Sequence, residues 1–466
     1  MVNFSHMGSF DEAIRKALGI EGKKTIEHPF RRLQSIPESK IEISEEWKQL
    51  LDIFEDTNES VFLTGRAGTG KSTLIQYFRN HSKKNIAVLA YTGVAAVNIQ
   101  GQTIHSFFGF RPGITEERVH VHFDHENLLY KKLDTIIIDE ISMVRADLFD
   151  CLEKFLRLNG PKPKQPFGGV QMILVGDLYQ LEPVTPDEEK ELFKTYYPSP
   201  FFFDSKAFQK IPFHKFMLKK VYRQTDENFI QILDAVRLAK LTPQELESLN
   251  DSCFQEVTYD KHGGHIFLVT TNRTAERINL HRLDKLKSKL FTFKGILSGK
   301  FREKNLPTEL ELRLKEGACV MLLNNDTESR WVNGDIATIH KIKPEDGTAR
   351  IFVELEDKTV TEVLPFIWEE IRYFYNKELK RIDSEVIGTF TQYPLRLAWA
   401  VTIHKGQGKT FDKVVVDFGR GTFAHGQAYV ALSRSRSLEG LVLRVPLEER
   451  HIFINRRVAE FMQTIG

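Results

Sequence analysis

Cysteine is scarce in this chain. Only three of its 466 residues are cysteines, Cys151, Cys253 and Cys319, and they lie far apart in the sequence. A disulfide framework needs paired cysteines, and a structural zinc or iron–sulfur site needs them at close CxxC-type spacing. The sequence therefore excludes both kinds of site. No other cluster of histidine, cysteine and acidic residues has metal-ligand spacing, so we expect the histidines to bind no metal.

Long apolar runs are also absent. The first ten residues, MVNFSHMGSF, contain no apolar stretch of the kind that a secretion signal needs, and every later apolar run is only as long as a strand. A membrane-spanning helix needs about 20 predominantly apolar residues in a row. We therefore expect a protein that is neither secreted nor inserted in a membrane, and that acts in the cytoplasm.

Net charge is close to zero, with 65 Lys+Arg against 63 Asp+Glu and a formal charge of +2. Nucleic-acid-binding domains are often strongly basic, so the total alone argues against such a partner. The distribution does not: residues 272–315 and 395–466 carry an excess of basic residues, whereas residues 316–394 carry an excess of acidic ones. A surface that binds phosphates needs positive charge only where it contacts them, so a nucleic-acid partner remains compatible with the sequence.

From about residue 44, short apolar runs alternate with helical patterns. One series is VFLT (61–64), NIAVLAY (85–91), TIIID (135–139) and QMILVGD (171–177); a second is HIFLVTTN (265–272), KVVVDFG (413–419) and GLVLRV (440–445). Continuous β-branched runs separated by helical spans indicate strands that are buried on both faces of a parallel sheet. The sequence thus predicts an α/β fold with two domains.

A different texture occupies residues 291–394, where short strand patterns are separated by glycine, Asn-Asn and Asp-Gly turn signals without long helices. This texture predicts a small all-β insert with a barrel-like fold. The predicted organisation is a tail or accessory segment over residues 1–43 and a first domain over 44–200. A second domain over 201–290 and 395–466 is interrupted by the insert.

The strongest local signal is GRAGTGKS at residues 65–72, which fits the pattern GxxxxGK[ST] between a predicted strand and a predicted helix. Glycines let backbone N–H groups curl around phosphate oxygens, and the helix N-terminus adds its positive end. Lys71 is expected to reach the β- and γ-phosphates, and Ser72 offers its hydroxyl to Mg²⁺. The predicted nucleotide-binding residues are Gly65, Ala67, Gly68, Thr69, Gly70, Lys71, Ser72 and Thr73.

Polar residues follow two neighbouring strands of the first series. Asp139 can hold Mg²⁺ beside the phosphate-binding loop, and Glu140 can polarise an attacking water. Alone, this acidic pair would indicate a solvated strand end; downstream of a phosphate-binding loop it indicates catalysis. Gln180 follows the strand around residues 172–175, and it is either a sensor that touches the γ-phosphate or a plain loop amide.

These motifs belong to a longer ordered set. GRAGTGKST (65–73) is followed by YTGVAAVNIQGQTIHSF (91–107), DEISMV (139–144), PFGGVQMILVGDLYQLEPV (166–184), VYRQ (221–224), TTNRTAERIN (270–279), AWAVTIHKGQGKTFDKVVVDFG (398–419) and YVALSRSRS (429–437). In this order and spacing the chain resembles the PIF-type DNA helicases of superfamily 1B, which are related to RecD, from about residue 55 to 445. Residues 140–160 resemble the segment that distinguishes the PIF type from other RecD relatives.

The resemblance implies two RecA-like P-loop NTPase domains with ATP and Mg²⁺ between them, and an SH3-like β insert in the second. It implies an ATP-dependent helicase that moves 5′ to 3′ on single-stranded DNA and unwinds duplex at single-strand/double-strand junctions, and G-quadruplexes or RNA–DNA hybrids are further substrates open to it. A nucleoid-associated monomer with roles in DNA repair, recombination and telomere maintenance is also expected. The direction of movement rests on the resemblance alone.

Catalytic roles are carried over by the same resemblance. The first domain supplies Lys71, Ser72, Asp139, Glu140 and Gln180, and the second supplies Arg223, Arg434 and, at the nucleotide, Gln407. A guanidinium that meets the charge developing on the γ-phosphoryl group is worth about 10³–10⁵ in rate. Arg436 and Arg444 are alternatives to Arg434. Because the arginines lie on the other domain, we expect hydrolysis to depend on domain closure.

Residues expected to hold DNA lie on loops at strand ends, where α/β sheets bind their ligands. Small polar groups suit phosphate contacts that carry no sequence information. The first domain offers Thr92, Gly93, Thr103 and His105, and the resemblance adds Asn272, Thr402, His404 and Lys405 from the second. His105 and His404 could instead be satisfied histidines near the phosphates. Phe107 and Phe108 could stack on bases, but core packing is the favoured role for both.

Residues 108–132 form an insertion that, by resemblance, is a small wedge meeting the duplex fork, braced by a helix over 146–158. The chain departs from its relatives at two points. Many relatives have a glutamine upstream of the phosphate-binding loop that reads adenine. Here Trp47 or Lys48 stands near that position and Gln49 is slightly displaced from it, so other nucleotides remain open. Gly406 replaces a common serine.

Two other functions remain open. One is a translocase or RecD-like subunit that needs a partner to unwind DNA. The other is a nucleotide-gated DNA-binding or remodelling protein that hydrolyses slowly, as a switch. The presence together of Glu140, Arg223 and Arg434 argues against the switch, and no second cluster of paired carboxylates suggests a nuclease.

Overall fold

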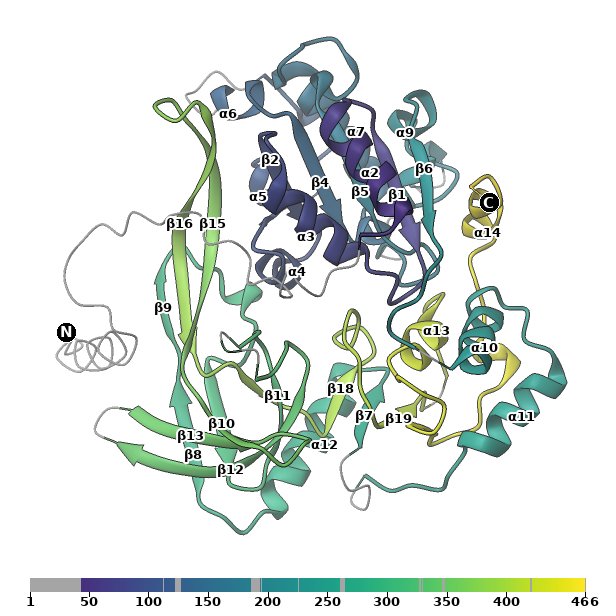
Figure 1. Cartoon of the computed structure of the whole chain (residues 1–466), viewed down its shortest axis with the longest axis vertical. Helices are drawn as coiled ribbons and strands as arrows, with labels where there is room; N and C mark the ends of the chain where they lie inside the picture. The colour runs from purple at the N-terminus through teal and green to yellow at the C-terminus, as the bar shows by residue number, and fades with distance from the viewer. Residues whose placement is uncertain are drawn as a thin grey trace.

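Two parallel α/β units and a β-rich insert make up the chain (Figure 1). The computed structural model describes residues 43–465 except 112, 122–126, 186–192, 194, 225, 260–264, 327, 329, 346–347 and 420. The predicted tail, residues 1–43, therefore lies outside the described residues apart from Ile43. Among the described residues, no helix combines the length and the apolarity that crossing a membrane requires.

The first unit is built on a six-stranded sheet with the order β3-β2-β4-β5-β1-β6, in which all neighbouring strands are parallel. Its strands are β1 Val61–Gly65, β2 Ile86–Ala90, β3 Gln102–Thr103, β4 Thr135–Asp139, β5 Gln171–Val175 and β6 His214–Leu218. Its helices are α2 Glu45–Asp56, α3 Lys71–His81, α4 Gly93–Asn98, α5 Ile104–Phe107, α6 Asn127–Lys131, α7 Ala146–Asn159 and α9 Lys206–Lys210. Every residue of β1 and β5 is buried, which explains their continuous apolar runs.

The second unit has a four-stranded parallel sheet with the order β18-β7-β19-β20. Its strands are β7 Ile266–Val269, β18 Ala400–Thr402, β19 Val414–Asp417 and β20 Leu441–Leu443. Its helices are α10 Glu227–Arg237, α11 Pro243–Cys253, α12 Asn272–Lys285 and α13 Gln427–Leu432. The predicted fold class, two RecA-like α/β units, is thus confirmed.

The domain boundaries differ from the prediction at two places. Residues 201–290 were expected in the second domain, but β6 pairs with β1 and is the edge strand of the first sheet, with Val61 opposite His214. Its first residues are exposed, so it lacks the apolar run that marks a central strand. The C-terminal helix α14, Arg456–Gln463, was also expected in the second domain and packs on the first unit instead.

Antiparallel strands fill the insert. The strands are β8 Leu290–Lys294, β9 Ile296–Gly299, β10 Glu311–Lys315, β11 Cys319–Leu322, β12 Ile336–Glu345, β13 Thr348–Glu354, β14 Val360–Val363, β15 Phe366–Asn376, β16 Arg381–Gln392 and β17 Leu395–Leu397. They form three sheets, β10-β8, β14-β13-β12-β11-β17 and β15-β16-β9. The only helical element among the described residues of this region is the 3₁₀ turn Glu303–Asn305. The insert is therefore all-β, and its likeness to an SH3 barrel stays a prediction.

A long hairpin of β15 and β16 extends from the insert along the first unit (Figure 1). The backbone N–H of Tyr373 donates to Gln102 Oε1 at 3.3 Å, and the N–H of Val88 donates to the Tyr373 hydroxyl at 3.3 Å. Near the hairpin tip, the N–H of Ile382 donates to Asn85 Oδ1 at 2.9 Å. These bonds join the insert to the β2–β3 edge of the first sheet.

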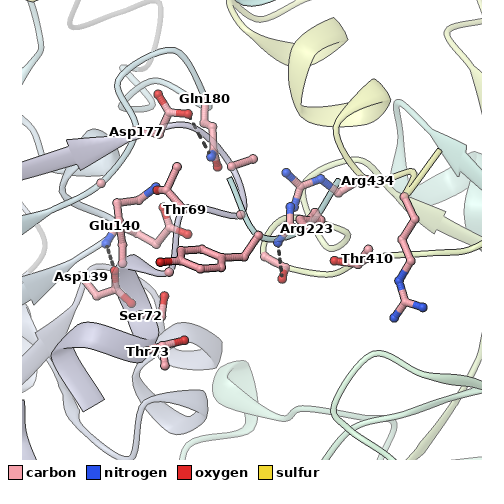
Figure 2. A pocket seen from close by; sticks show the side chains of 18 of the residues that line it. Thr69, Ser72, Thr73, Asp139, Glu140, Asp177, Gln180, Arg223, Thr410 and Arg434 are labelled. Atoms are coloured by element: carbon pink, nitrogen blue, oxygen red, sulfur yellow. Dashed lines mark hydrogen bonds between the residues drawn. The ribbon is translucent and has the colours of Figure 1, made fainter. Parts of the chain in front are cut away.

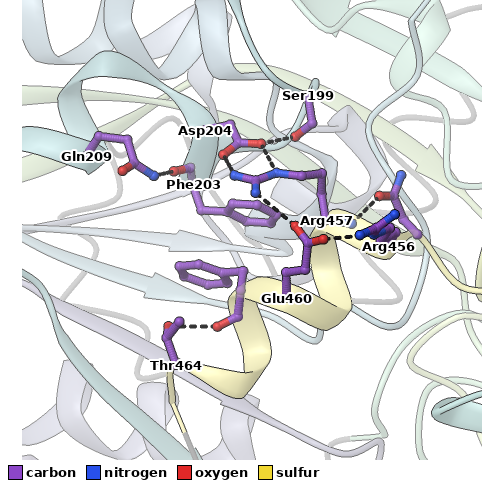
Figure 3. Close-up of polar contacts among 10 residues, drawn as sticks. Ser199, Phe203, Asp204, Gln209, Arg456, Arg457, Glu460 and Thr464 are labelled. Carbon is purple, nitrogen blue, oxygen red and sulfur yellow. Dashed lines mark hydrogen bonds and ion pairs between the residues drawn. The ribbon is translucent and has the colours of Figure 1, made fainter.

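Helix α14 carries the end of the chain back from the second unit to the first (Figure 3). The Phe461 ring stacks on Phe203 with a centroid distance of 4.3 Å and an interplanar angle of 2°. Arg457 forms ion pairs with Asp204 at 2.5 Å and with Glu460 at 3.0 Å. The helix therefore ties the end of the second unit to the first unit.

We expect Phe461→Ala to weaken this tie. Removing a packed, half-buried ring costs about 2–3 kcal/mol, which lowers the thermal midpoint of a domain this large by about 4–10 °C. Leu379→Ala, at the hairpin tip where the leucine is 54% exposed, is the control and should shift the midpoint by no more than about 1–2 °C. Differential scanning calorimetry of both variants measures this, and equal midpoints would show that α14 contributes nothing to stability.

Candidate nucleotide-binding and catalytic site

The phosphate-binding loop joins the end of β1 to the start of α3, as predicted. Gly68 and Gly70 have φ values of +79° and +83°, in the left-handed region that glycine tolerates best. Space is also limiting, because a Cβ added at Gly68 would lie 2.4 Å from the Cβ of Arg223. The loop conformation and the neighbouring unit thus both require glycine here.

Lys71 lies in the curve of this loop. Its Nζ donates to the carbonyl oxygens of Gly65 at 2.8 Å and of Arg66 at 2.9 Å. Burial lowers the pKa of Lys71, while the charges of Asp177 and Glu140 act in the opposite direction. An ammonium held only by carbonyl oxygens is ready to move to phosphate oxygens, which bind it more strongly.

Two carboxylates stand at the end of β4, facing the loop. The backbone N–H of Glu140 donates to Asp139 Oδ1 at 2.9 Å, and Glu140 itself has left-handed backbone angles, φ 51° and ψ 44°. Such angles are uncommon for a residue with a side chain and often mark functional sites. Desolvation first, and then the charge of Asp139, raises the pKa of Glu140 to about 7. Burial also raises the pKa of Asp139. A carboxylate of raised pKa is a better proton acceptor, as a general base must be.

Two arginines of the second unit reach the same place. Arg434 is 1% exposed and donates to the carbonyl of Val430 at 2.8 Å and to that of Lys409 at 3.2 Å. Burial, and then the charge of Arg223, lowers the pKa of Arg434 to about 9. Arg223 donates to the carbonyl of Gly408 at 3.3 Å. Both guanidinium groups are held by neutral carbonyls, so their charge is available to a phosphate.

One cavity of about 660 Å³ joins these groups, with the carboxylates on one side and the arginines on the other (Figure 2). It is lined by Trp47, Ala67, Gly68, Thr69, Gly70, Lys71, Ser72, Thr73, Asp139, Glu140, Gly176, Asp177, Gln180, Tyr222, Arg223, Gly408, Thr410, Arg434 and Arg436. Its size is typical of a small-molecule site. The structure therefore brings the predicted phosphate, metal and catalytic residues together across the two units.

The alternatives to Arg434 are placed differently. Arg436 lines the cavity but forms an ion pair with Asp412 at 2.8 Å, and Arg444 forms one with Asp417 at 3.2 Å. Their charges are already neutralised by carboxylates, which leaves Arg434 as the better candidate for contacting a phosphate.

Gln180 and Gln407 meet in the interface between the units. Gln407 Nε2 donates to Glu140 Oε2 and to Gln180 Oε1, both at 3.1 Å, and Gln180 Nε2 donates to Asp177 Oδ2 at 3.3 Å. Gln407 was assigned to the nucleotide by resemblance, and its contacts here are with the catalytic side chains. Gln180 lies on the cavity wall, where a γ-phosphate sensor would have to be, and its role as a sensor stays a prediction.

Several residues that line the cavity or contact its loop were missed or left open by the sequence. Trp47, 4% exposed, and Tyr222, 46% exposed, both lie beside Gly70, where their rings offer apolar surface to a nucleobase. The Tyr429 hydroxyl of the second unit accepts the backbone N–H of Ala67 at 2.9 Å. Tyr222 precedes Arg223 in VYRQ and Tyr429 opens YVALSRSRS, so their motifs were visible but their contacts were not.

The predicted DNA-binding residues lie in two groups. In the first unit, the hydroxyls of Thr92 and Thr103 accept the backbone N–H groups of Ala95 and Ser106 and so cap helices α4 and α5. Position 93 faces the insert, because a Cβ on Gly93 would lie 1.9 Å from Asn305 Oδ1. This part of the predicted DNA path is therefore covered by the insert in the present conformation.

In the second unit, Asn272 is the exposed first residue of α12, and the hydroxyl of Thr402 accepts the N–H of Lys405 at 3.3 Å. The His404 ring lies nearly parallel to that of Phe423, with an angle of 12° and a centroid distance of 6.0 Å. In the first unit, the His105 ring meets the ring of Tyr91 edge-on.

Core packing is the role of the two phenylalanines that were considered for base stacking. Phe107 is 3% and Phe108 1% exposed, and their rings meet edge-on at 4.9 Å. The alternative in which they stack on bases is therefore wrong, and the favoured interpretation is confirmed.

Part of the predicted wedge, residues 112 and 122–126, lies outside the described residues. The remainder contacts α7, as expected of a brace: Lys154 Nζ donates to the carbonyl of Glu116 at 2.6 Å, and Asn159 Nδ2 donates to that of His120 at 3.2 Å.

Comparisons with known proteins agree with this geometry. A family model described as PIF1-like helicase matches residues 42–245. The chain is 34% identical to the ATP-dependent DNA helicase Pif1 of Bdellovibrio bacteriovorus, over 91% of this chain and 93% of that protein. It is also 34% identical to human ATP-dependent DNA helicase PIF1, over 94% of this chain but only 66% of that longer protein. The chain thus spans about two thirds of the length of its human relative.

Solved structures of a Pif1 from Bacteroides sp are similar as well. The complex with ADP-AlF4 has a TM-score of 0.84 and 34% identity, covering 91% of this chain and 97% of that one. A structure of the same helicase bound to single-stranded DNA has a TM-score of 0.65 at the same identity and coverage. The unliganded structure has a TM-score of 0.82, so the present conformation is more similar to the two structures whose titles name no DNA than to the DNA complex.

We expect Glu140→Gln to separate binding from hydrolysis. The amide keeps the shape of the side chain but cannot accept the proton of the attacking water, so nucleotide affinity should stay within about threefold while turnover falls about 10²–10⁴-fold. Fluorescent-nucleotide titration and phosphate release measure the two quantities. Glu439→Gln, at an exposed position of the second unit, is the matched control. Near-normal turnover in Glu140→Gln would refute the role of Glu140 as base.

Proposed function

Because this chain belongs to the PIF1-like helicase family, we propose that it is an ATP-dependent DNA helicase that moves along single-stranded DNA and unwinds the duplex ahead of it. One observation carries the proposal: Arg223 and Arg434 of the second unit line the same cavity as Lys71 and Glu140 of the first. ATP bound there touches both units, so each hydrolysis event changes the contacts that hold the units together.

Residues of both units take part in ATP hydrolysis, each in a different role. Lys71 and the N–H groups of the loop bind the β- and γ-phosphates, and Glu140 accepts the proton of the attacking water. Arg223 and Arg434 stabilise the charge that spreads over the γ-phosphoryl group in the transition state. After hydrolysis and loss of that group, the arginines lose their anionic partner, which favours opening of the interface.

Mg²⁺ is the proposed metal. Ser72 and Asp139 lie on the same cavity wall and supply a hydroxyl and a carboxylate, the hard oxygen ligands that Mg²⁺ prefers. When bound, the ion neutralises charge on the β- and γ-phosphate oxygens.

At the carboxyl edges of the two sheets, the proposed DNA path follows the loops that carry Thr92, Thr103, Thr402, His404 and Lys405. Alternate closing and opening of the two units would then advance the strand. For the direction we propose 5′ to 3′, on the resemblance of the motifs. We propose that the protein acts at the nucleoid in the cytoplasm, where it would meet single-stranded DNA.

We propose that the substrate is a junction of single- and double-stranded DNA. We also propose that a single chain is the active unit. Both halves of the ATP cavity come from one chain, which supports the monomer. A structure of Bacteroides Pif1 at forked DNA is described as two coordinating helicases, so the number of chains at a fork is a quantity to measure, by mass photometry of fork complexes.

Strand displacement tests the function and its direction together. On duplexes of one sequence with a 5′ tail, a 3′ tail or blunt ends, we expect ATP-dependent unwinding of the 5′-tailed duplex only. Lys71→Ala is the control and should abolish unwinding, because the phosphates lose their ammonium partner. Unwinding of the 3′-tailed duplex would contradict the direction. ATP hydrolysis that single-stranded DNA leaves unchanged would favour the slow switch over the motor.

We expect Phe423 to stack on a base. It is 63% exposed and lies nearly parallel to His404 in a loop at the carboxyl edge of the second sheet. Since a stacked base contributes about 1–3 kcal/mol, Phe423→Ala should weaken binding of single-stranded DNA about 5- to 100-fold while leaving DNA-independent hydrolysis within about twofold. Tyr196→Ala, at an equally exposed aromatic, is the control. Fluorescence anisotropy measures the affinity, and unchanged DNA binding in Phe423→Ala would exclude the stacking role.

A further inference from the structure

A buried ion pair crosses the interface between the two units, next to the catalytic groups. Asp177 follows β5 in the first unit and is 1% exposed, and Arg237 ends α10 in the second unit and is 5% exposed. Arg237 Nη2 donates to Asp177 Oδ1 at 3.1 Å. Sixty residues separate the two in sequence, so no local motif predicts the contact.

Aromatic rings hold Arg237 in place. Its guanidinium lies over the ring of Tyr179, in the first unit, at 4.4 Å and near that of Tyr429, in its own unit, at 6.0 Å. Its Nε atom is buried without a hydrogen-bond partner among the described residues. Burying an ion pair is costly and often adds no net stability, and an unpaired buried donor costs more. The arrangement is therefore poorly explained as a device for stability alone.

Asp177 uses both of its oxygens to order the loop that carries Gln180. Oδ1 accepts the N–H of Tyr179 at 3.2 Å in addition to Arg237, and Oδ2 accepts Gln180 Nε2 at 3.3 Å. An ionised carboxylate can only accept, so it binds the amino end of the Gln180 amide. The oxygen end of that amide then points to Gln407, which also donates to Glu140.

An unbroken series of hydrogen bonds therefore runs from the second unit to the catalytic base and crosses the interface three times. Its order is Arg237, Asp177, Gln180, Gln407, Glu140. The first and fourth members come from the second unit, and the other three come from the first. Separation of the units breaks the series at all three crossings, and Asp177 then loses the cation that compensates its burial.

We propose that Arg237 is a positioning residue for ATP hydrolysis: from the second unit it fixes the Asp177 carboxylate, which orients the Gln180 amide, so that the catalytic set is in order only when the two units are closed. The role is distinct from that of Arg223 and Arg434, because Arg237 acts through Asp177 and does not line the nucleotide cavity. This inference rests on the proposed ATPase activity.

Steady-state hydrolysis by Arg237→Gln tests the proposal. Glutamine is neutral and cannot hold the carboxylate as a guanidinium does, so we expect kcat to fall about 10- to 30-fold while the affinity for a fluorescent ATP analogue changes less than about threefold. Arg237→Lys keeps the charge without the planar fork and should recover part of the loss.

A matched control lies one turn earlier on the same helix. Asp234 forms an ion pair with Arg66 of the first unit at 2.6 Å, at the same interface, but no hydrogen bond joins Asp234 to Asp177 or Gln180 among the described residues. Asp234→Asn should therefore keep kcat within about threefold of the parent chain. An equal loss in Asp234→Asn and Arg237→Gln would overturn the proposal, since any weakening of the interface would then suffice.

The decisive comparison uses Gln180→Ala as background. If Arg237 acts through Gln180, then Arg237→Gln should reduce kcat by less than about twofold once Gln180 has been removed. Losses that multiply, 10- to 30-fold on top of the loss from Gln180→Ala, would show that Arg237 acts by another route and would overturn the proposal.

Folding is followed by the thermal midpoint of each variant. If Arg237→Gln unfolds because Asp177 is left charged and unpaired, the double variant Asp177→Asn with Arg237→Gln removes both charges. Its kcat should still be reduced at least about 10-fold, because a neutral amide does not fix Gln180, and a normal kcat would refute the inference. The failure of the proposed function is distinguishable, since the parent chain itself would then hydrolyse no ATP.

Discussion

The phosphate-binding loop is covered by the second α/β unit, and its backbone bonds to the segment that leads into that unit and to the unit itself. Tyr222 donates its N–H to the carbonyl of Gly68 at 2.8 Å, and the Tyr429 hydroxyl accepts the N–H of Ala67 at 2.9 Å. Arg66 adds an ion pair to Asp234 on helix α10. Whatever binds to this loop must therefore act on the contact between the units, and the placement of Arg223, Arg434 and Arg237 depends on the same contact.

The charges at this interface explain why the formal net charge of +2 says little about whether the chain binds nucleic acid. Four cationic and three anionic side chains line one cavity, so their charges nearly cancel in a count while each has a separate position. They are Lys71, Arg223, Arg434 and Arg436, with Asp139, Glu140 and Asp177. The pKa of Glu140 is raised and that of Arg434 is lowered mainly because burial disfavours both charges. A phosphate and its metal ion would bring the compensating charges, which fits a site that is assembled for an anionic ligand.

The sequence alone was enough to predict the elements that are determined by residues close together in the chain. The glycines of residues 65–70, the β-branched runs of the central strands and the carboxylates at the end of β4 all lie where the sequence placed them. Strand β6 and helix α14 were assigned to the wrong unit. The residue pattern of an exposed edge strand or a short terminal helix does not show which unit it packs against. The pairing of Asp177 with Arg237 and of Gln407 with Glu140 arises only when the units close, so no spacing could reveal it.

We propose that one nucleotide site is completed by both units and that Arg223 and Arg434 both meet the transferring phosphoryl group. A crystal structure of this chain with Mg²⁺, ADP and aluminium fluoride tests it most directly. We expect Lys71 to leave the carbonyls of Gly65 and Arg66 for the nucleotide, and Arg223 and Arg434 both to lie within hydrogen-bond distance of the fluoride. A nucleotide that contacts the first unit alone, with both arginines still bound to backbone carbonyls, would contradict it.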